Sequence, residues 1–145
     1  MDKILIVDDE ESIRKVLKIF LENEGYNVAT ASSLAETYSS LKKDKFSLIL
    51  LDINLPDGNS LDYLRKIKEL SSNISVIVMT AQDTMNNAIQ AIKKGAYDYI
   101  TKPFDFDESF TNTIERAVKN SIKDVRIQKL ETDIKKHDTN SFNII

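Results

Sequence analysis

The chain has 145 residues, of which 41% are hydrophobic and 30% are charged, and this composition is typical of one folded domain with a short appendage. It contains no cysteine, which excludes disulfides and thiol chemistry, and its net charge of -3 provides no general attraction for nucleic acid. The first apolar run is too short for a signal peptide or a membrane span, so we expect a cytoplasmic protein without membrane contact.

Short apolar runs recur along the chain at the length of a strand. In chain order they are Ile4–Val7, a weaker run at Asn27–Ala31, Leu48–Leu51, Val76–Met79 and the mixed run Tyr97–Ile100. Runs that are apolar throughout are expected where helices cover both faces of a parallel sheet. We therefore predict a parallel sheet that is buried on both faces.

Helical patterns follow these runs. Apolar residues recur at helical spacing in five stretches: Ile13, Val16, Leu17, Phe20 and Leu21; Leu34, Tyr38 and Leu41; Leu61, Leu64, Ile67 and Leu70; Met85, Ala88, Ile89 and Ile92; and Phe106, Phe110, Ile114 and Ala117. The candidate N-terminal caps of the second and third stretches are Ser32–Ser33 and Asn59–Ser60. The fourth stretch is expected to begin near Thr84. The first and fourth stretches are expected to end at Gly25 and Gly95. This alternation predicts an α/β domain, a doubly wound five-stranded parallel sheet that ends near residue 120.

Helical character continues beyond residue 120 without proline or glycine. Ile127, Leu130 and Ile134 have the spacing of a coiled-coil seam, although the apolar residues before them are out of phase with it. We favour a dimerisation helix over residues 121–138, and a solvated helical linker is the alternative.

Polar residues follow the predicted strands at one edge of the sheet. The first run leads to Asp8 and Asp9, the third to Asp52, the fourth to Thr80, and the fifth to Lys102. The crevice beyond the carboxyl ends of parallel strands is the usual ligand site, and the first and third strands are neighbours in a flavodoxin-like order. We therefore expect the three carboxylates to converge, although each one alone is more often a helix cap or a turn residue.

Three neighbouring carboxylates repel one another by about 4 kcal/mol for each close pair at an effective dielectric constant near 20. A divalent cation relieves this repulsion, and the all-oxygen ligand set favours Mg²⁺, which keeps positions open for phosphate oxygens. One carboxylate is then free to attack phosphorus. Lys102 supplies positive charge to the phosphoryl group and Thr80 a hydrogen bond.

Four segments of the sequence resemble the receiver domain of two-component response regulators. They are Ile6-Val7-Asp8-Asp9-Glu10, Leu51-Asp52-Ile53-Asn54-Leu55-Pro56-Asp57-Gly58, Val78-Met79-Thr80-Ala81 and Tyr97-Asp98-Tyr99-Ile100-Thr101-Lys102-Pro103-Phe104. The resemblance covers residues 1–120 and implies a receiver domain with a flavodoxin-like or CheY-like fold.

The resemblance also implies a role for each matching side chain at the sheet edge. Asp52 is the phosphoryl acceptor, and Lys102 pairs with the phosphoryl group. Asp9, Asp52 and the main-chain carbonyl of Asn54 bind Mg²⁺, and Asp8 binds it directly or through water. A sensor histidine kinase is the implied donor.

Two further residues form the implied switch. Thr80 moves toward the phosphoryl group, and Tyr99 then turns inward, so that the surface of the fourth helix, fifth strand and fifth helix changes shape. The chain is not expected to be an enzyme, apart from slow self-dephosphorylation. An aspartyl-phosphate hydrolase would need a carboxylate at position 54, where Asn54 cannot transfer a proton, and a flavin site is disfavoured by the acidic residues after the first strand.

The stretch Asp83–Phe104 is similar to the receivers of NtrC-type transcriptional activators, in which a helical linker leads to an AAA+ ATPase and a DNA-binding domain. Residues 139–145 resemble the approach to such an ATPase. No glycine-rich phosphate loop occurs, so nucleotide hydrolysis is not assigned to this chain. No nucleic-acid contact is assigned either, because the mixed charges after residue 120 are more typical of a solvated helix face.

We therefore expect a homodimeric fragment of a larger activator, and phosphorylation either makes or breaks the dimer. The alternative is a free-standing receiver that acts by phosphorylation-dependent protein binding.

Overall fold

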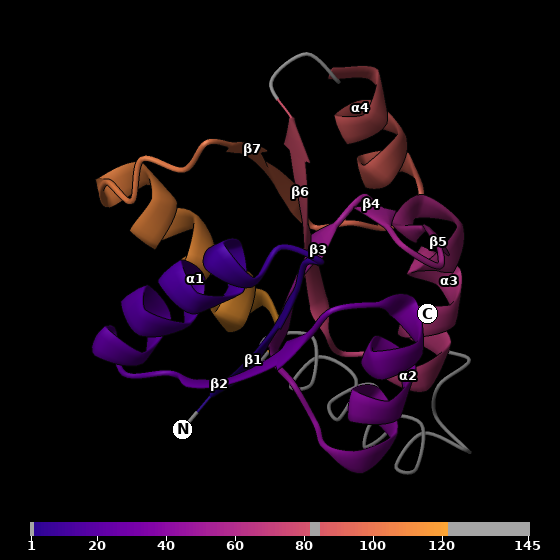
Figure 1. The fold of residues 1–145 in the computed structure, drawn as a ribbon, viewed down its shortest axis with the longest axis horizontal. Helices are drawn as coiled ribbons and strands as arrows, with labels where there is room; N and C mark the ends of the chain where they lie inside the picture. Colours follow the sequence, from indigo (N-terminus) through magenta and orange to yellow (C-terminus); the bar gives the residue numbers. More distant parts are fainter. Residues whose placement is uncertain (1, 82–84, 122–145) are drawn as a thin grey trace, which may run out of the picture.

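The computed structural model describes residues 2–81 and 85–121. They form a five-stranded parallel sheet in the order β2-β1-β3-β6-β7 (Figure 1). The strands are β1 (Lys3–Val7), β2 (Asn27–Ala31), β3 (Leu48–Asp52), β6 (Ser75–Ala81) and β7 (Asp98–Lys102). The doubly wound α/β fold with a parallel sheet is confirmed.

Helices cover both faces of the sheet. The helices are α1 (Glu11–Asn23), α2 (Leu34–Lys43), α3 (Leu64–Leu70), α4 (Met85–Lys93) and a helical stretch over 108–121. In Figure 1, α1 and the orange helix 108–121 lie on one side of the sheet, and α2, α3 and α4 lie on the other. Among the described residues, none of the helices has the length and apolar character that crossing a membrane requires.

The hydrophobic core is divided by the sheet. Leu5 and Val7 of β1 belong to the cluster under α2 and α3, whereas Ile4 and Ile6 belong to the cluster under α1 and the helix 108–121. Successive strand residues point to opposite faces, so strands buried on both faces must be apolar at every position. This explains why the strands appear in the sequence as continuous apolar runs.

Two helices end as their glycines predict. Gly25 and Gly95 follow α1 and α4 with φ angles of +99° and +114°, a region that glycine enters without a steric penalty. The amide of Gly25 donates to the Glu22 carbonyl at 3.0 Å, and the amide of Gly95 donates to the Ile92 carbonyl at 3.1 Å.

The apolar face predicted for α4 is wrong in part. Ala88 and Ala91 are fully buried, whereas Ile89 and Ile92 are 47% and 44% exposed. The small alanine side chains allow the helix to lie close to β6 and β7, which turns the larger isoleucines outward. Val16 of α1 is likewise 50% exposed, so periodicity alone did not fix which apolar residues enter the core.

Two predicted helix starts also need correction. Before α3, where the sequence predicted a single helix, the chain forms a 3-10 helix at Ser60–Tyr63. Asn59 caps this 3-10 helix, because its side chain accepts a hydrogen bond from the amide of Leu61 at 2.9 Å. Ser60 is therefore not the cap. Phe106 precedes the last helix and has a φ angle of +50°, so it lies in the loop after β7 and not on the helix.

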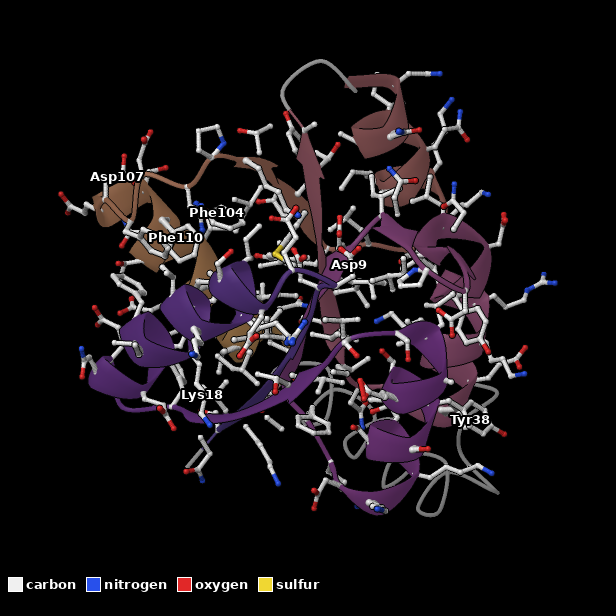
Figure 2. All side chains as sticks on the ribbon, viewed as in Figure 1. Asp9, Lys18, Tyr38, Phe104, Asp107 and Phe110 are labelled. Carbon is white, nitrogen blue, oxygen red and sulfur yellow. The ribbon has the colours of Figure 1, made fainter. Side chains whose placement is uncertain are left out.

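Phe106 nevertheless packs in an aromatic cluster with Phe20, Phe104 and Phe110. The ring centroid of Phe106 lies 4.8 to 5.8 Å from those of the other three, and Phe110 also contacts Phe20 and Phe104. Figure 2 shows Phe104 and Phe110 beside the first turn of the last helix. The cluster fixes the loop that follows Lys102 against α1.

Several predictions concern other parts of the chain. The start of the fourth helix at Thr84, the coiled-coil residues and almost all of the linker over 121–138, and the segment 139–145 lie outside the described residues.

Candidate functional site

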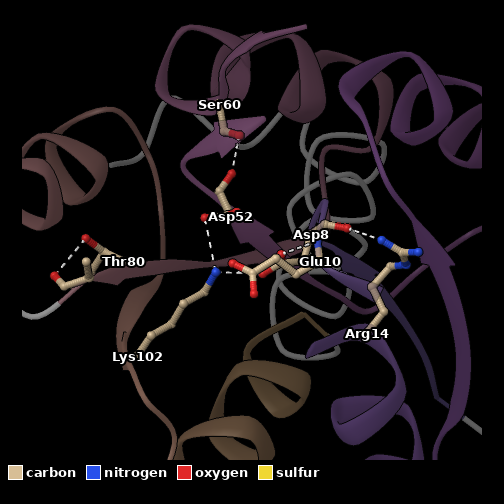
Figure 3. Close-up of polar contacts among 8 residues, drawn as sticks. Asp8, Glu10, Arg14, Asp52, Ser60, Thr80 and Lys102 are labelled. Carbon is tan, nitrogen blue, oxygen red and sulfur yellow. Dashed lines mark hydrogen bonds and ion pairs between the residues drawn. The ribbon is translucent and has the colours of Figure 1, made fainter. Parts of the chain in front are cut away.

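The parallel sheet brings the predicted site residues to one edge. β1 pairs with β3 up to Val7 and Leu51, so Asp8 and Asp52 each come one residue after the last pair. On the other side of β3, Asp52 pairs with Met79, and the next residue, Thr80, pairs with Thr101 of β7. The strand order thus collects polar groups from four strand ends (Figure 3).

Asp8 is the most deeply buried of these acids, with no exposed surface. Its Oδ2 accepts a hydrogen bond from Lys102 Nζ at 2.7 Å, and its Oδ1 accepts one from the amide of Glu10 at 2.9 Å. The guanidinium of Arg14 donates to the Asp8 carbonyl oxygen at 2.8 Å. The carboxylate is therefore held in one orientation by Glu10, two residues away, and by Lys102, 94 residues away.

Lys102 links two of the acids. Its ammonium group lies 2.7 Å from Asp8 Oδ2 and 3.5 Å from Asp52 Oδ1 (Figure 3). Burial alone would lower the pKa of Lys102, but the hydrogen bond to Asp8 and the negative charges of Asp52 and Asp8 outweigh burial and raise the pKa above its ordinary value. The lysine is therefore a fixed positive charge between the acids.

Asp52 has a perturbed carboxyl group. Burial, followed by the charge of Asp8, raises the pKa of Asp52 to about 6, and Lys102 opposes this shift. Its side chain is only 13% exposed. Among the side chains around it, the carboxylate is thus short of compensating positive charge, which is the condition under which it gains most from a cation.

The acidic residues after β1 form a cluster. One carboxylate oxygen each from Asp8, Asp9 and Glu10 lie within 4.8 Å of one another. Hard oxygen donors in such an arrangement suit Mg²⁺. Glu10 was not predicted as a site residue, because its approach depends on the turn after β1 and not on its position at a strand end.

The acids and the lysine border a cleft of about 350 Å³. Its lining comes from five segments: Asp9, Glu10, Asp52, Ile53, Asn54, Met79, Thr80, Ala81, Asn87 and Lys102. A larger cavity of about 860 Å³ is bordered by Phe46, Leu70 and Asn73 and contains none of the predicted site residues. The size of a cavity therefore does not locate the chemistry here.

The two predicted switch residues lie on neighbouring strands. Thr80 is 3% exposed, and its hydroxyl donates to the Ala81 carbonyl at 3.3 Å. Tyr99 is half-buried on β7, one edge of the sheet, and pairs with Val78. Their switching role remains a prediction.

The loop after Asp52 is held at its base and at its tip. At the base, the hydroxyl of Ser60 donates to the Asp52 carbonyl oxygen. At the tip, the carboxylate of Asp57 accepts hydrogen bonds from the amides of Leu34 and Ala35 at 2.9 and 3.0 Å, and these bonds lower the pKa of Asp57. Sequence reasoning missed both contacts, because each joins residues whose proximity only the folded chain creates.

The model of the response regulator receiver domain matches residues 4–114. The chain therefore belongs to the response regulator receiver family. It is a CheY-like receiver of the kind found in NtrC-family regulators, as three comparisons indicate.

A solution structure described as the beryllofluoride-activated NtrC4 receiver domain dimer is 42% identical, with a TM-score of 0.77, and the match covers 83% of this chain and 99% of that one. The transcriptional regulator NtrC of Rhizobium meliloti is 39% identical over 130 residues, which are 90% of this chain and 26% of the relative. The alginate biosynthesis regulator AlgB of Pseudomonas putida is 35% identical over 134 residues, which are 92% of this chain and 30% of the relative. The chain thus spans less than a third of the length of these two curated relatives.

Proposed function

We propose that this receiver accepts a phosphoryl group on Asp52 from a sensor histidine kinase, in a reaction that depends on Mg²⁺. One observation carries the proposal: Lys102 Nζ lies 2.7 Å from Asp8 and 3.5 Å from Asp52, beside the acidic cluster of Asp8, Asp9 and Glu10. A nucleophilic carboxylate, a fixed cation and an oxygen-rich metal site are the groups that phosphoryl transfer to aspartate requires.

In the proposed step, a carboxylate oxygen of Asp52 forms a bond to phosphorus. The bond between phosphorus and the donor's histidine nitrogen breaks, and its electron pair leaves with the nitrogen. Lys102 then faces a group that carries more negative charge than the carboxylate did. The distance of 3.5 Å between Lys102 Nζ and Asp52 Oδ1 supports a role for the lysine in holding the transferred phosphoryl group.

The residues at this edge fit a magnesium ion. Asp9 and Asp52 would hold it with the main-chain carbonyl of Asn54, and Asp8 directly or through water; these four remain proposed ligands. When bound, Mg²⁺ neutralises charge on the transferring phosphoryl oxygens. The raised pKa of Asp52 supports this ligand set, because it reflects a carboxylate without enough neighbouring positive charge.

Thr80 and Tyr99 are the proposed switch. The Thr80 hydroxyl now donates to the carbonyl of Ala81, and donation to a phosphoryl oxygen would require it to turn or move. Such a shift changes the packing beside β7, where Tyr99 is half-buried. A ligand shifts a two-state equilibrium only through contacts that differ between the states, and this exchange of hydrogen-bond partners is such a difference.

The proposed output is control of a downstream AAA+ module that activates transcription. The proposed arrangement is a receiver over 1–120, a linker over 121–138 and the start of another domain over 139–145. The alignment with AlgB extends over 134 residues, more than the receiver match at 4–114, which supports a relationship beyond the receiver. A cytoplasmic location fits this role.

We also propose that the chain forms a homodimer. The similarity to an activated NtrC4 receiver dimer supports this, and so do the exposed isoleucines of α4, Ile89 and Ile92. The linker helix over 121–138 is a second proposed contact.

Intact mass spectrometry after incubation with acetyl phosphate and Mg²⁺ tests the acceptor. We expect the mass to rise by one phosphoryl group in the wild-type chain, but not in Asp52→Asn or after removal of Mg²⁺ by a chelator. An unchanged wild-type mass would refute the proposal. If Asp52→Asn gained the same mass as the wild type, another residue would be the phosphoryl acceptor.

Sedimentation velocity with and without beryllofluoride tests the dimer. Ile92→Ser should reduce association if α4 takes part, and truncation after residue 121 should reduce it if the linker does. If neither change affects association in either state, both contacts are wrong.

A further inference from the structure

The peptide that follows Asp52 is held by a buried serine. Ser60 has no exposed surface, although its hydroxyl is polar, and a buried polar group is normally retained only with a hydrogen-bond partner. That partner is the main-chain carbonyl oxygen of Asp52 (Figure 3). The serine therefore contacts the backbone of the acceptor residue itself.

The strand register explains why this carbonyl needs a side-chain donor. The amide of Ile53 donates to the Met79 carbonyl on β6 at 3.3 Å. In a planar trans peptide the carbonyl points away from the N–H, so the Asp52 carbonyl points toward β1. The pairing of β1 with β3 ends at Val7 and Leu51, and Ser60 supplies a donor just beyond that end.

Ser60 also holds the next peptide. Its amide donates to the Ile53 carbonyl at 2.8 Å, so one residue fixes the two carbonyls before Asn54. Asn54 then pairs with Asn59 across the hairpin of β4 (Asn54–Leu55) and β5 (Gly58–Asn59). The direction of the Asn54 carbonyl therefore depends on the contacts of Ser60.

We propose that Ser60 is a positioning residue for the phosphoryl-acceptor site, because its hydroxyl orients the Asp52–Asn54 backbone for cation binding. This inference rests on the proposed function, in which Asp52 and the Asn54 carbonyl hold Mg²⁺. Ser60 acts through the groups that it holds and does not itself contact the cleft, whose lining does not include it.

Ser60→Ala is the direct test. It removes the hydroxyl but keeps the hydrogen bond that the main-chain amide of residue 60 donates to the Ile53 carbonyl. Ser75 offers a matched control: it is equally buried, and its hydroxyl donates to a main-chain carbonyl, that of Ala117, at 2.7 Å. Ser75 is the first residue of β6, so it lies at the amino ends of the strands, away from the carboxyl ends that carry the site. Ser75→Ala should thus destabilise the fold without disturbing the cation site.

The measurements are the Mg²⁺ dissociation constant, from a ¹H–¹⁵N NMR titration of the full chain, and the rate of phosphorylation by acetyl phosphate at subsaturating Mg²⁺. We expect Ser60→Ala to weaken Mg²⁺ binding by about tenfold, as the loss of a group that orients metal ligands typically does, and to slow phosphorylation. Ser75→Ala should leave both unchanged, and Ser60→Thr, which keeps the hydroxyl, should bind Mg²⁺ more tightly than Ser60→Ala. Where Ser60→Ala does not fold, Ser60→Cys keeps the volume, replaces the hydroxyl by a weak donor and should show the same loss.

Equal Mg²⁺ affinity in the wild type and Ser60→Ala would overturn the inference and leave the proposed function standing. Equal losses in Ser60→Ala and Ser75→Ala would also overturn it, since they would reflect general destabilisation. A wild-type chain that neither binds Mg²⁺ nor accepts a phosphoryl group would overturn the proposed function and this inference together.

Discussion

Asp52 should destabilise the metal-free protein at neutral pH. Its pKa is about 6 in the folded chain, against an ordinary value of 3.8, so folding favours the protonated carboxyl group. The stability from this shift is fully present below pH 3.8 and is lost as the pH rises through about 6. A shift of roughly two units corresponds to about 3 kcal/mol, which we reduce to about 2 kcal/mol because the group borders an open cleft.

The perturbation that isolates this effect is Asp52→Asn, which has nearly the same shape and no charge to desolvate. Urea unfolding without metal should show the variant more stable than the wild type by about 2 kcal/mol at pH 7.5. The difference should shrink as the pH falls and nearly vanish at about pH 3, where the carboxyl is protonated in both the folded and the unfolded chain. Mg²⁺ at pH 7.5 should stabilise the wild type more than the variant, since the wild type offers one more carboxylate.

A difference that does not depend on pH would refute this reasoning. So would a variant that is less stable than the wild type at pH 7.5, because Asp52 would then be stabilised by Lys102 more than it is destabilised by burial and by Asp8.

Three further changes test other parts of the structure. Lys102→Ala leaves the buried carboxylate of Asp8 without its cation, so it should lower the unfolding free energy by about 3 kcal/mol at pH 7. The same change should strengthen Mg²⁺ binding, because a competing positive charge is gone. Weaker Mg²⁺ binding would show that the lysine does not compete with the ion. Asp57→Ala removes the acceptor of the Leu34 and Ala35 amides, so hydrogen exchange at these two amides should accelerate while exchange in β3 does not, and unchanged exchange would mean that the contact is not made in solution. Ala88→Leu should overpack the buried side of α4 and lower the unfolding free energy by about 1 to 3 kcal/mol. Ile89→Ala should lower it by less than about 0.5 kcal/mol, and urea unfolding of both variants will measure the two effects. A larger loss in Ile89→Ala than in Ala88→Leu would support the helix face predicted from the sequence.

The sheet and the strand-end residues could be predicted because each depends on a local signal. A strand covered on both faces must be apolar throughout, so β1, β3 and most of β6 are visible as continuous runs. Parallel strands then bring their carboxyl ends to one edge, which places Asp8 beside Asp52 without knowledge of any side-chain conformation. Gly25 and Gly95 mark helix ends for a similar reason, since few other residues adopt their backbone angles.

The remaining features depend on contacts between distant segments. A serine before an apolar run has the sequence signature of a helix cap, but Ser60 is buried and bonds to Asp52. In α4, alanine and isoleucine are both apolar, and only the closeness of the sheet decides that Ala88 enters the core while Ile89 stays outside. The participation of Glu10 depends on a turn whose geometry the pattern of residues does not encode.

The contact between Asp8 and Lys102 joins residues that are 94 positions apart, the first at the end of β1 and the second at the end of β7. A nascent chain that has not yet produced β7 already contains every acid of the site but not the ammonium group that partly balances them. In the proposed function, which needs Lys102, the site becomes able to accept a phosphoryl group only when the last strand docks. A chain cut between β3 and β6 would yield two pieces that are each inert, and recovery of phosphoryl acceptance on mixing them would report the reassembly of the sheet.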